Sequence, residues 1–191
     1  MPYGTRINST IHRPHPTVTI AVPTVAQNVR KVGFDTAQAG DVIVMNGHGV
    51  LHYAMLGGNI GLGLKHRGIA GMVMDGAFRD MAAFREMDLP MFASGICTLP
   101  GPKEGPGEVN VPIACGGVVV NPGDIIVADD DGIVCVPPAS AEEVLDAVSR
   151  INANFAAMHA NLLRGAVTGV EALRLQLRRE GWWFEDEPFS S

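Results

Sequence analysis

Apolar residues in the first two thirds of the chain form short, continuous runs separated by glycine, proline and aspartate. Runs of this kind predict strands, and the run at residues 40–45 predicts a strand that is buried on both faces of a sheet. They cover residues 17–22, 40–45, 70–74, 89–93, 118–120, 124–128 and 132–136. Helices are predicted between them, over residues 52–66 and 81–87. This alternation predicts a single α/β domain with a right-handed crossover between the second and third runs.

The segments between these runs carry weaker signals. Residues 13–16 contain two prolines and predict a turn, and residues 46–49 contain two glycines and predict a loop. Residues 24–39 are polar and show no clear period. The connections at 121–123 and 129–132 are short, so the last three runs are predicted to be antiparallel neighbours.

The last third of the chain has a helical period. Ser140 and Glu143 have the spacing of a capping box, and a second box at Thr168 is predicted to start another helix that ends at Gly181. The apolar positions of the first helix are Val144, Val148, Ile151, Phe155, Met158 and Leu162. We expect Trp182 and Trp183 to lie at a subunit contact or to pack on the same chain.

These patterns divide the chain into three predicted parts. Residues 1–138 form an α/β core that carries the functional site. Residues 139–181 form C-terminal helices that pack on the core or on a neighbouring subunit, and residues 182–191 form a tail.

Composition narrows the class of protein. With 191 residues, of which 47% are apolar and 18% charged, the chain can bury one good core. A net charge of −6 argues against non-specific binding of nucleic acid. Three cysteines that occur singly predict buried thiols in a reducing compartment. We find no apolar run typical of a signal peptide or a membrane span, so we expect a cytoplasmic protein without membrane contact.

The strongest candidate for chemistry is the pair Arg79 and Asp80, which follows the buried run at 70–74. A guanidinium and a carboxylate at the end of such a strand can hold an anionic substrate and a hard metal ion. The alternative is an ordinary surface ion pair in which Asp80 caps the next helix.

Other motifs are less specific. Residues 57–63 are rich in glycine but lack both the Lys-Ser/Thr of a phosphate loop and the glycine order of a dinucleotide loop. His48 and His52 have the spacing of a zinc helix without the glutamate of a metalloprotease, so they are expected in a loop. The aspartates at 129–131 lack the distal glutamate of an EF-hand and are expected in a turn.

Four stretches together resemble a known family: residues 68–80, 89–93, 107–112 and 121–132. This family contains the class II 4-hydroxy-4-methyl-2-oxoglutarate / 4-carboxy-4-hydroxy-2-oxoadipate aldolases and the regulator of ribonuclease E activity. Its members have often been mislabelled as demethylmenaquinone methyltransferases. The resemblance implies an RraA-like fold, a single α/β domain of the swivelling phosphohistidine-domain type, here with a C-terminal helical extension. It also implies a homotrimer or a dimer of trimers with sites between subunits.

The resemblance also implies roles for individual residues. In such aldolases the Arg that matches Arg79 binds the substrate and stabilises enolate charge, and the Asp that matches Asp80 holds Mg²⁺ or Mn²⁺. The backbone groups that face the substrate carboxylate match those of Gly57, Gly58, Asn59 and Ile60. The implied enzyme is a metal-dependent lyase that cleaves a 4-hydroxy-2-oxo acid to pyruvate and decarboxylates oxaloacetate as a side activity.

The chain departs from the family pattern at two places. The pattern has an acidic residue twenty-one positions before the Arg, and this position is Gly58 here. A glutamate that a neighbouring subunit would offer from its long helix corresponds to residues 152–154, which read Asn-Ala-Asn. Two alternatives therefore stay open. One is a non-catalytic protein-binding regulator like the ribonuclease E inhibitor, and the other is a diverged enzyme that uses the same metal-enolate site.

Overall fold

A computed structural model describes residues 11–15, 17–21, 27–164 and 169–182. The chain divides into two compact units, residues Met1–Ala141 and Glu142–Ser191, and each is described by itself. The elements of the first unit are β1 (Ile11–His15), β2 (Thr17–Ala21), α1 (Gln27–Thr36), β3 (Val42–Ala54), α2 (Gly58–His66), β4 (Gly71–Phe78), α3 (Met81–Met87), β5 (Met91–Ile96), β6 (Glu108–Val109), β7 (Ile113–Cys115), β8 (Val118–Val120), β9 (Ile125–Ala128), β10 (Ile133–Val136) and the short 3-10 helix Pro138–Ser140.

A five-stranded sheet with the order β5-β4-β3-β2-β6 lies at the centre of the first unit. The strands β2, β3, β4 and β5 run parallel, and β6 is antiparallel to β2 at one edge. The helices α2 and α3 each connect two neighbouring parallel strands, as the α/β pattern of the sequence predicts. The α/β class is therefore confirmed.

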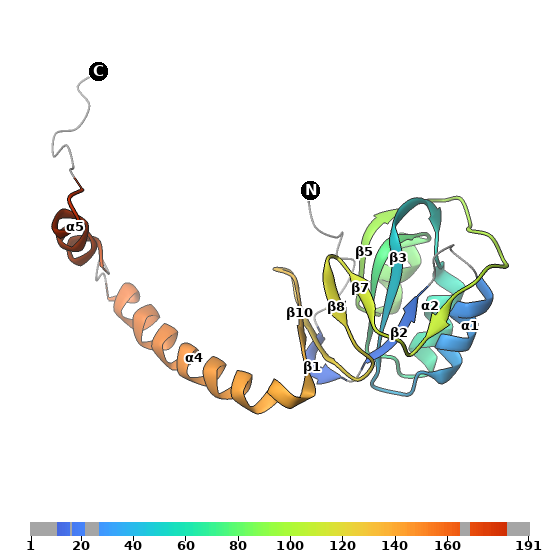
Figure 1. Cartoon of the computed structure of the whole chain (residues 1–191), viewed down its shortest axis with the longest axis horizontal. Helices are drawn as coiled ribbons and strands as arrows, with labels where there is room; N and C mark the ends of the chain where they lie inside the picture. Colours follow the sequence, from blue (N-terminus) through green and yellow to red (C-terminus); the bar gives the residue numbers. More distant parts are fainter. Residues whose placement is uncertain (1–10, 16, 22–26, 165–168, 183–191) are drawn as a thin grey trace, which may run out of the picture. The chain divides into compact units, whose positions relative to one another are not determined.

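The central sheet is buried on both faces, because alternate side chains of β3 enter two different hydrophobic clusters. Ile43 and Met45 pack in a cluster that includes Leu64 of α2 and Phe84 of α3. On the opposite face, Val42 and Val44 pack in a second cluster with residues of β7, β8 and β9: Ile113, Val120, Ile126 and Ala128. Figure 1 shows this layering, with α1 and α2 on one side of β3 and β7 and β8 on the other.

Two small antiparallel sheets form the second layer. One has the order β1-β9-β10 and the other pairs β7 with β8. The predicted pairing of β9 with β10 is confirmed, and Asp129–Asp131 lie in the turn between them. The expectation that β8 also pairs with β9 is wrong, because β8 forms its hairpin with β7.

The structure corrects three local predictions. Residues 13–15 belong to β1 and not to a turn, because they pair with β9, more than a hundred residues away; Pro14 is tolerated on this edge strand. Residues 46–49 are an irregular part of β3, with positive φ at His48 and Gly49, and not a loop. The helix expected from residue 52 begins only at Gly58. Helix α1 was not expected, because most of its residues are polar and it has no acidic residue in its first turn.

Helices α2 and α3 touch through a glycine. A Cβ built on Gly61 would lie 2.4 Å from Cε1 of Phe84. Phe84 is fully buried and packs edge-to-face on Phe78, with ring centroids 5.3 Å apart. The ring therefore has little room to move, and only glycine allows the two helices to approach this closely.

This contact predicts opposite effects for two glycines of the same helix. Gly61→Ala should lower the free energy of unfolding by about 1–3 kcal/mol, because the added methyl group overpacks the core. Gly63 is exposed, and a Cβ there would meet no atom within 4 Å. Gly63→Ala should therefore raise the free energy of unfolding by about 0.5–1 kcal/mol. Urea unfolding of both variants tests this, and equal effects would contradict the helix contact.

The second unit contains two helices, α4 (Ala141–Leu163) and α5 (Val170–Arg179). Both were predicted; Gly181 follows α5 with φ +87°, as expected of a residue after a helix end. Thr168 and Trp183 lie outside the described residues, while Trp182 is exposed. Within the described part of the chain, no helix combines the length and apolar character needed to cross a bilayer.

Candidate active site

Two neighbouring parallel strands end side by side and bring the predicted site residues together. Strand β3 ends at Ala54 and leads to Gly57, and β4 ends at Phe78 and leads to Arg79 and Asp80. Backbone hydrogen bonds hold these ends in register, since the Arg79 N–H donates to Leu56 O at 3.0 Å. The carboxyl ends of parallel strands are the usual position of ligand sites in α/β folds.

Asp80 adopts a strained conformation and its carboxylate faces helix α2. Its backbone is left-handed, with φ 64° and ψ 42°, which is uncommon for a residue other than glycine. Asp80 precedes α3 but makes no side-chain cap to it. Instead, Oδ2 accepts a hydrogen bond of 2.8 Å from the Gly58 N–H, the first N–H of α2. His48, Asp88 and Asn110 adopt the left-handed conformation elsewhere in the described chain, so the hydrogen bond to Gly58, and not the backbone conformation, ties Asp80 to this site.

Arg79 lies beside this carboxylate with much of its hydrogen-bonding capacity unused. Its Nε is 3.7 Å from Asp80 Oδ2, and the two side chains are 42% and 49% exposed. Among the described residues the guanidinium donates no hydrogen bond to protein. Its Nη groups can therefore receive an anion from solvent.

Gly57 and Gly58 leave room for this arrangement. A Cβ on Gly57 would lie 2.5 Å from Asp80 Oδ2 and 2.7 Å from Arg79 Nε. A Cβ on Gly58 would lie 2.9 Å from the Cβ of Ala83 on α3. Both glycines are thus required by the close approach of other groups, and not by a positive φ.

Arg79, Asp80, Gly57 and Gly58 together form one corner of the first unit. The first turn of α2 supplies backbone donors to this corner. The N–H of Asn59 has no partner among the described residues, and the N-terminus of a helix favours a negative charge. The Asn59 side chain is exposed. Ile60 differs, because its N–H donates to Gly57 O at 3.0 Å and its side chain packs against the core. Gly57, Gly58 and Asn59 therefore border the corner directly, while Ile60 holds the turn together.

The donor set around Asp80 fits only a metal ion that keeps most of its water ligands. Asp80 Oδ1 has no hydrogen-bond partner among the described residues, whereas Oδ2 is engaged by Gly58. In the part of the chain that the structure describes, no three His, Cys, Asp or Glu side chains are grouped to hold a metal. Mg²⁺ and Mn²⁺ bind through one or two carboxylates plus water and substrate oxygens, so one carboxylate oxygen suits them.

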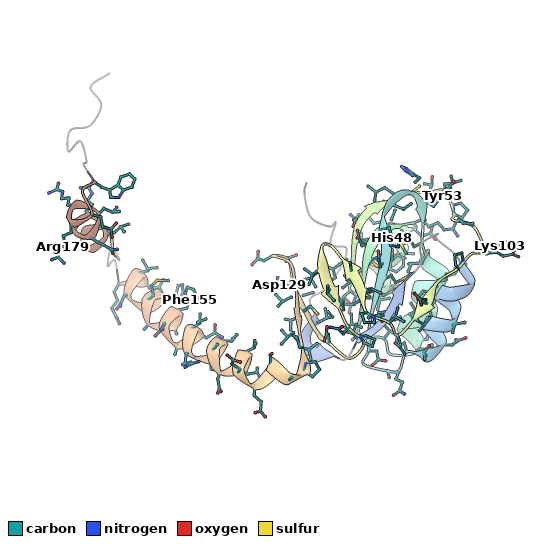
Figure 2. The ribbon with its side chains drawn as sticks, in the orientation of Figure 1. His48, Tyr53, Lys103, Asp129, Phe155 and Arg179 are labelled. Atoms are coloured by element: carbon teal, nitrogen blue, oxygen red, sulfur yellow. The ribbon has the colours of Figure 1, made fainter. Side chains whose placement is uncertain are left out.

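The remaining candidate residues lie apart from this corner. His48 and Tyr53 lie in β3 (Figure 2), and the His48 N–H donates to Asn46 Oδ1 at 2.7 Å. Asp129 accepts hydrogen bonds from the N–H groups of Asp131 and Gly132, which is the geometry of an ordinary turn.

A hollow of about 520 Å³ lies away from Arg79 and Asp80, between β4, β5 and the two hairpins. Its charged lining residues are carboxylates: Asp75, Asp129, Asp130 and Asp131. A dianionic acid would be repelled there, whereas Arg79 attracts it. The corner at Arg79 is therefore the better site for an anionic substrate.

Two cysteine thiols border this hollow and are held in the neutral form. Burial, and secondarily the charge of Asp75, raises the pKa of Cys115 from its ordinary value of 9.0 to about 12. Burial and a hydrogen bond of 3.4 Å to the Asp124 carboxylate raise the pKa of Cys135 to about 11. Such thiols are poor nucleophiles at neutral pH.

The raised thiol pKa predicts a loss of stability in alkali. Above pH 9 the unfolded chain releases the Cys115 thiol proton, which the folded chain retains. The contribution of this thiol to the free energy of unfolding is therefore complete below pH 9 and disappears as pH rises toward 12. The Tm should therefore fall between about pH 8.5 and about pH 10.5, and it should fall less steeply in Cys115→Ala. Parallel Tm profiles of the wild type and the variant would exclude this thiol as a cause.

Comparisons with known proteins identify the family. Residues 9–135 match the family model described as RraA-like: Aldolase/RraA. The chain is 39% identical over 144 residues to a protein of Halalkalibacterium halodurans provisionally named 4-hydroxy-4-methyl-2-oxoglutarate aldolase, which covers 75% of this chain and 66% of that protein. It is 40% identical over 109 residues to the 4-hydroxy-4-methyl-2-oxoglutarate aldolase of Thermus thermophilus, covering 57% of this chain and 66% of that protein. The chain thus spans slightly less than two thirds of the length of these relatives.

Solved structures give the same result. The RNA-processing inhibitor RraA from Thermus thermophilis superposes with a TM-score of 0.62 and 31% identity, covering 71% of this chain and 87% of that chain. RraAS2 of Streptomyces coelicolor, an unusual member of the RNase ES inhibitor RraA family, superposes with a TM-score of 0.69 and 28% identity, covering 83% of both chains. The matched residues include β3, β4 and the Arg79–Asp80 corner between them. The chain therefore belongs to the RraA-like aldolase/RraA family and has its α/β fold.

Proposed function

We propose that this protein is a metal-dependent lyase that breaks a carbon–carbon bond of a 2-oxo acid and releases pyruvate. The observation that carries the proposal is the corner where Arg79, Asp80 and the first turn of α2 meet. It combines a cation for charge that develops on oxygen, a carboxylate for a metal, and backbone donors for a substrate carboxylate. The aldolase names of its relatives support the same class.

Each group has a defined task in this proposal. The substrate carboxylate accepts a hydrogen bond from the Asn59 N–H at the helix N-terminus. Asp80 Oδ1 would hold Mg²⁺ or Mn²⁺, which would supply polarisation of the 2-oxo group of the substrate. As the bond between C3 and C4 breaks, the C4 fragment leaves as CO₂ or as a carbonyl compound. The electron pair of the broken bond forms the C2–C3 double bond of an enolate, whose oxygen is negative. Arg79 stabilises this enolate charge, and water then protonates C3 to give pyruvate.

The two reactions that pass through this enolate make different demands on the protein. Cleavage of a 4-hydroxy-2-oxo acid requires a group that removes the C4 hydroxyl proton, whereas decarboxylation of oxaloacetate releases CO₂ without this step. In the described structure, Arg79 and Asp80 form no hydrogen bond or ion pair with a third titratable side chain. Position 58 is glycine, and Ala83 leaves little space for a side chain there. We therefore expect oxaloacetate to react faster than a 4-hydroxy-2-oxo acid.

A panel of acids tests the proposal. Purified protein with Mg²⁺ or Mn²⁺ is mixed with oxaloacetate, 4-hydroxy-4-methyl-2-oxoglutarate and 4-carboxy-4-hydroxy-2-oxoadipate, and pyruvate is measured with lactate dehydrogenase. Pyruvate should appear with metal and stop when EDTA is added. Oxaloacetate should give a kcat/KM at least about 10-fold above those of the hydroxy acids, which corresponds to about 1.4 kcal/mol. Failure to turn over any of the three acids would reject the lyase proposal.

The second candidate is a non-catalytic regulator that binds an RNA-processing enzyme. The observation that favours it is the structural likeness to the RNA-processing inhibitor RraA, at 31% identity over 87% of that chain. A regulator of this kind would bind its partner equally well after Asp80→Asn. Binding of an RNase E-type enzyme by both proteins, together with no turnover of any acid, would support the regulator.

A further inference from the structure

The hollow between β4, β5 and the two hairpins is lined by buried apolar side chains and by carboxylates. Its volume of about 520 Å³ lies in the range of pockets that bind small molecules, and all of its lining residues belong to the first unit. The apolar lining comes from the second hydrophobic cluster, on the face of the central sheet opposite α2 and α3: Val44, Val73, Phe92, Val120 and Ile126. This lining suits the hydrocarbon part of a ligand.

Asp75 places a carboxylate next to this apolar lining. In β4 it is the one residue that is not buried, and it lies on the same face of the sheet as Val73, two residues before it. Asp75 Oδ1 accepts a hydrogen bond of 3.1 Å from the Ser94 hydroxyl. Among the described residues, Oδ2 accepts no hydrogen bond and no Lys, Arg or His side chain pairs with Asp75. A half-buried carboxylate without such a partner attracts a cation.

A buried amide beside Asp75 has an unused donor. Asn46 of β3 is in register with Asp75 and is only 7% exposed. It lies two residues after Val44 and therefore on the face of the sheet that borders the hollow. Its Oδ1 accepts the His48 N–H, whereas its Nδ2 donates to no group among the described residues. Buried donors are normally paired, so an acceptor atom of a ligand would satisfy this one.

The charges of the hollow exclude an anion as its ligand. Besides Asp75, the charged lining residues are the exposed Asp129, Asp130 and Asp131, and Asp129 lies in the turn between β9 and β10 (Figure 2). In the described ranges no three His, Cys, Asp or Glu side chains are grouped to hold a metal ion, so a bare metal ion would find too few ligands. An organic cation needs one carboxylate and also uses the apolar lining.

We propose that this hollow binds a small organic cation that carries a protonated amine, a neighbouring oxygen and an apolar body, as an aryl amino alcohol does. The ammonium group pairs with Asp75, and the oxygen accepts a hydrogen bond from Asn46 Nδ2. The apolar body packs against Val44, Val73 and Phe92. The proposal does not depend on the lyase activity, because none of these residues belongs to the corner at Arg79 and Asp80.

Three related compounds test the recognition by calorimetric titration of the full chain at neutral pH. The probe 2-amino-1-phenylethanol should bind with a Kd below about 1 mM. 2-Phenylethylamine, which lacks the hydroxyl group, should bind about 3- to 10-fold more weakly. 1-Phenyl-1,2-ethanediol, which lacks the ammonium group, should bind at least about 10-fold more weakly. Absence of binding by the probe, or equal affinity of either analogue, would overturn the proposal.

Substitution of single carboxylates separates a specific contact from general attraction by negative charge. Asp75→Asn retains the size of the side chain and an acceptor for the Ser94 hydroxyl, and the Kd of the probe should rise at least about 10-fold. Asp88→Asn, at the end of α3, is the matched control and should change the Kd less than about twofold. Asp131→Asn removes an exposed charge of the hollow and should change it less than about threefold. Equal effects of Asp75→Asn and Asp131→Asn would contradict a site at Asp75.

A crystal structure of the wild-type protein with 2-amino-1-(4-bromophenyl)ethanol locates the ligand without relying on any variant. The anomalous signal of bromine should lie in the hollow, against the side chains of Val44, Val73 and Phe92. The ammonium nitrogen should lie within hydrogen-bonding distance of the Asp75 carboxylate. Bromine at any other place in the first unit, with the hollow empty, would show that the proposal is wrong.

Discussion

Replacement of Asp80 by asparagine is expected to lower kcat/KM for pyruvate release about 100- to 1,000-fold. Asparagine has nearly the same size and also tolerates the left-handed backbone that Asp80 adopts, with φ 64°. The substitution removes the negative charge that would hold the metal, while the amide oxygen can still accept the Gly58 N–H. The fold should therefore persist, with a Tm within a few degrees of the wild type.

Asp88→Asn is the matched control for this substitution. Asp88 also has a left-handed backbone, with φ 51°, and it lies at the opposite end of α3 from Asp80. The same change of charge is made on the same helix, away from the corner, so kcat/KM should change less than about twofold. Titration with Mn²⁺ provides a readout that is independent of turnover, and binding should weaken only in Asp80→Asn. Equal activity of the wild type and Asp80→Asn would remove this carboxylate from the mechanism.

Gly57→Ala is expected to lower kcat/KM about 10- to 100-fold with little effect on stability. Gly57 has an extended backbone, with φ −142° and ψ −179°, so alanine introduces no backbone strain. Its methyl group would instead occupy space within 2.5 Å of Asp80 Oδ2 and 2.7 Å of Arg79 Nε. Both atoms belong to flexible, half-exposed side chains, so they can move away at small energetic cost. That movement takes them out of the geometry needed for catalysis.

Gly63→Ala controls for the addition of a methyl group near the same helix. It lies in α2 with open space around its Cβ position, so its kcat/KM should match that of the wild type. Crystal structures of both variants would show the displacement of Arg79 and Asp80 directly. Full activity of Gly57→Ala with the two side chains displaced would contradict the assignment of the corner as the active site.

The sequence is sufficient to locate Arg79 and Asp80 after a strand, because a run of neighbouring apolar residues predicts that strand. The run at 70–74 is continuous and apolar, and residues 75–78 separate it from Arg79 and Asp80. The structure extends this run into β4, Gly71–Phe78, and the pair follows directly. Helix α3, Met81–Met87, was likewise predicted at the same residues, because Phe84 and Met87 give it one apolar face.

The geometry of the corner could not be read from the sequence. A cap on α3 by Asp80 was an open alternative, whereas the structure turns the carboxylate toward the Gly58 N–H of α2. This contact joins residues twenty-two positions apart and depends on the register of β3 with β4. No local pattern encodes it, since register is decided by packing of both sheet faces.

Local sequence patterns thus determine some features of this protein, and contacts between distant segments determine the others. The sequence alone determined the α/β class, the parallel strands, the helices α3 and α4 and the position of Arg79–Asp80, because each depends on the period of neighbouring residues. Only the tertiary structure decided that residues 13–15 form a strand, that residues 46–49 continue β3, and that Asp80 faces α2. These features arise from hydrogen bonds and contacts between segments far apart in the chain, and such contacts can override weak local preferences.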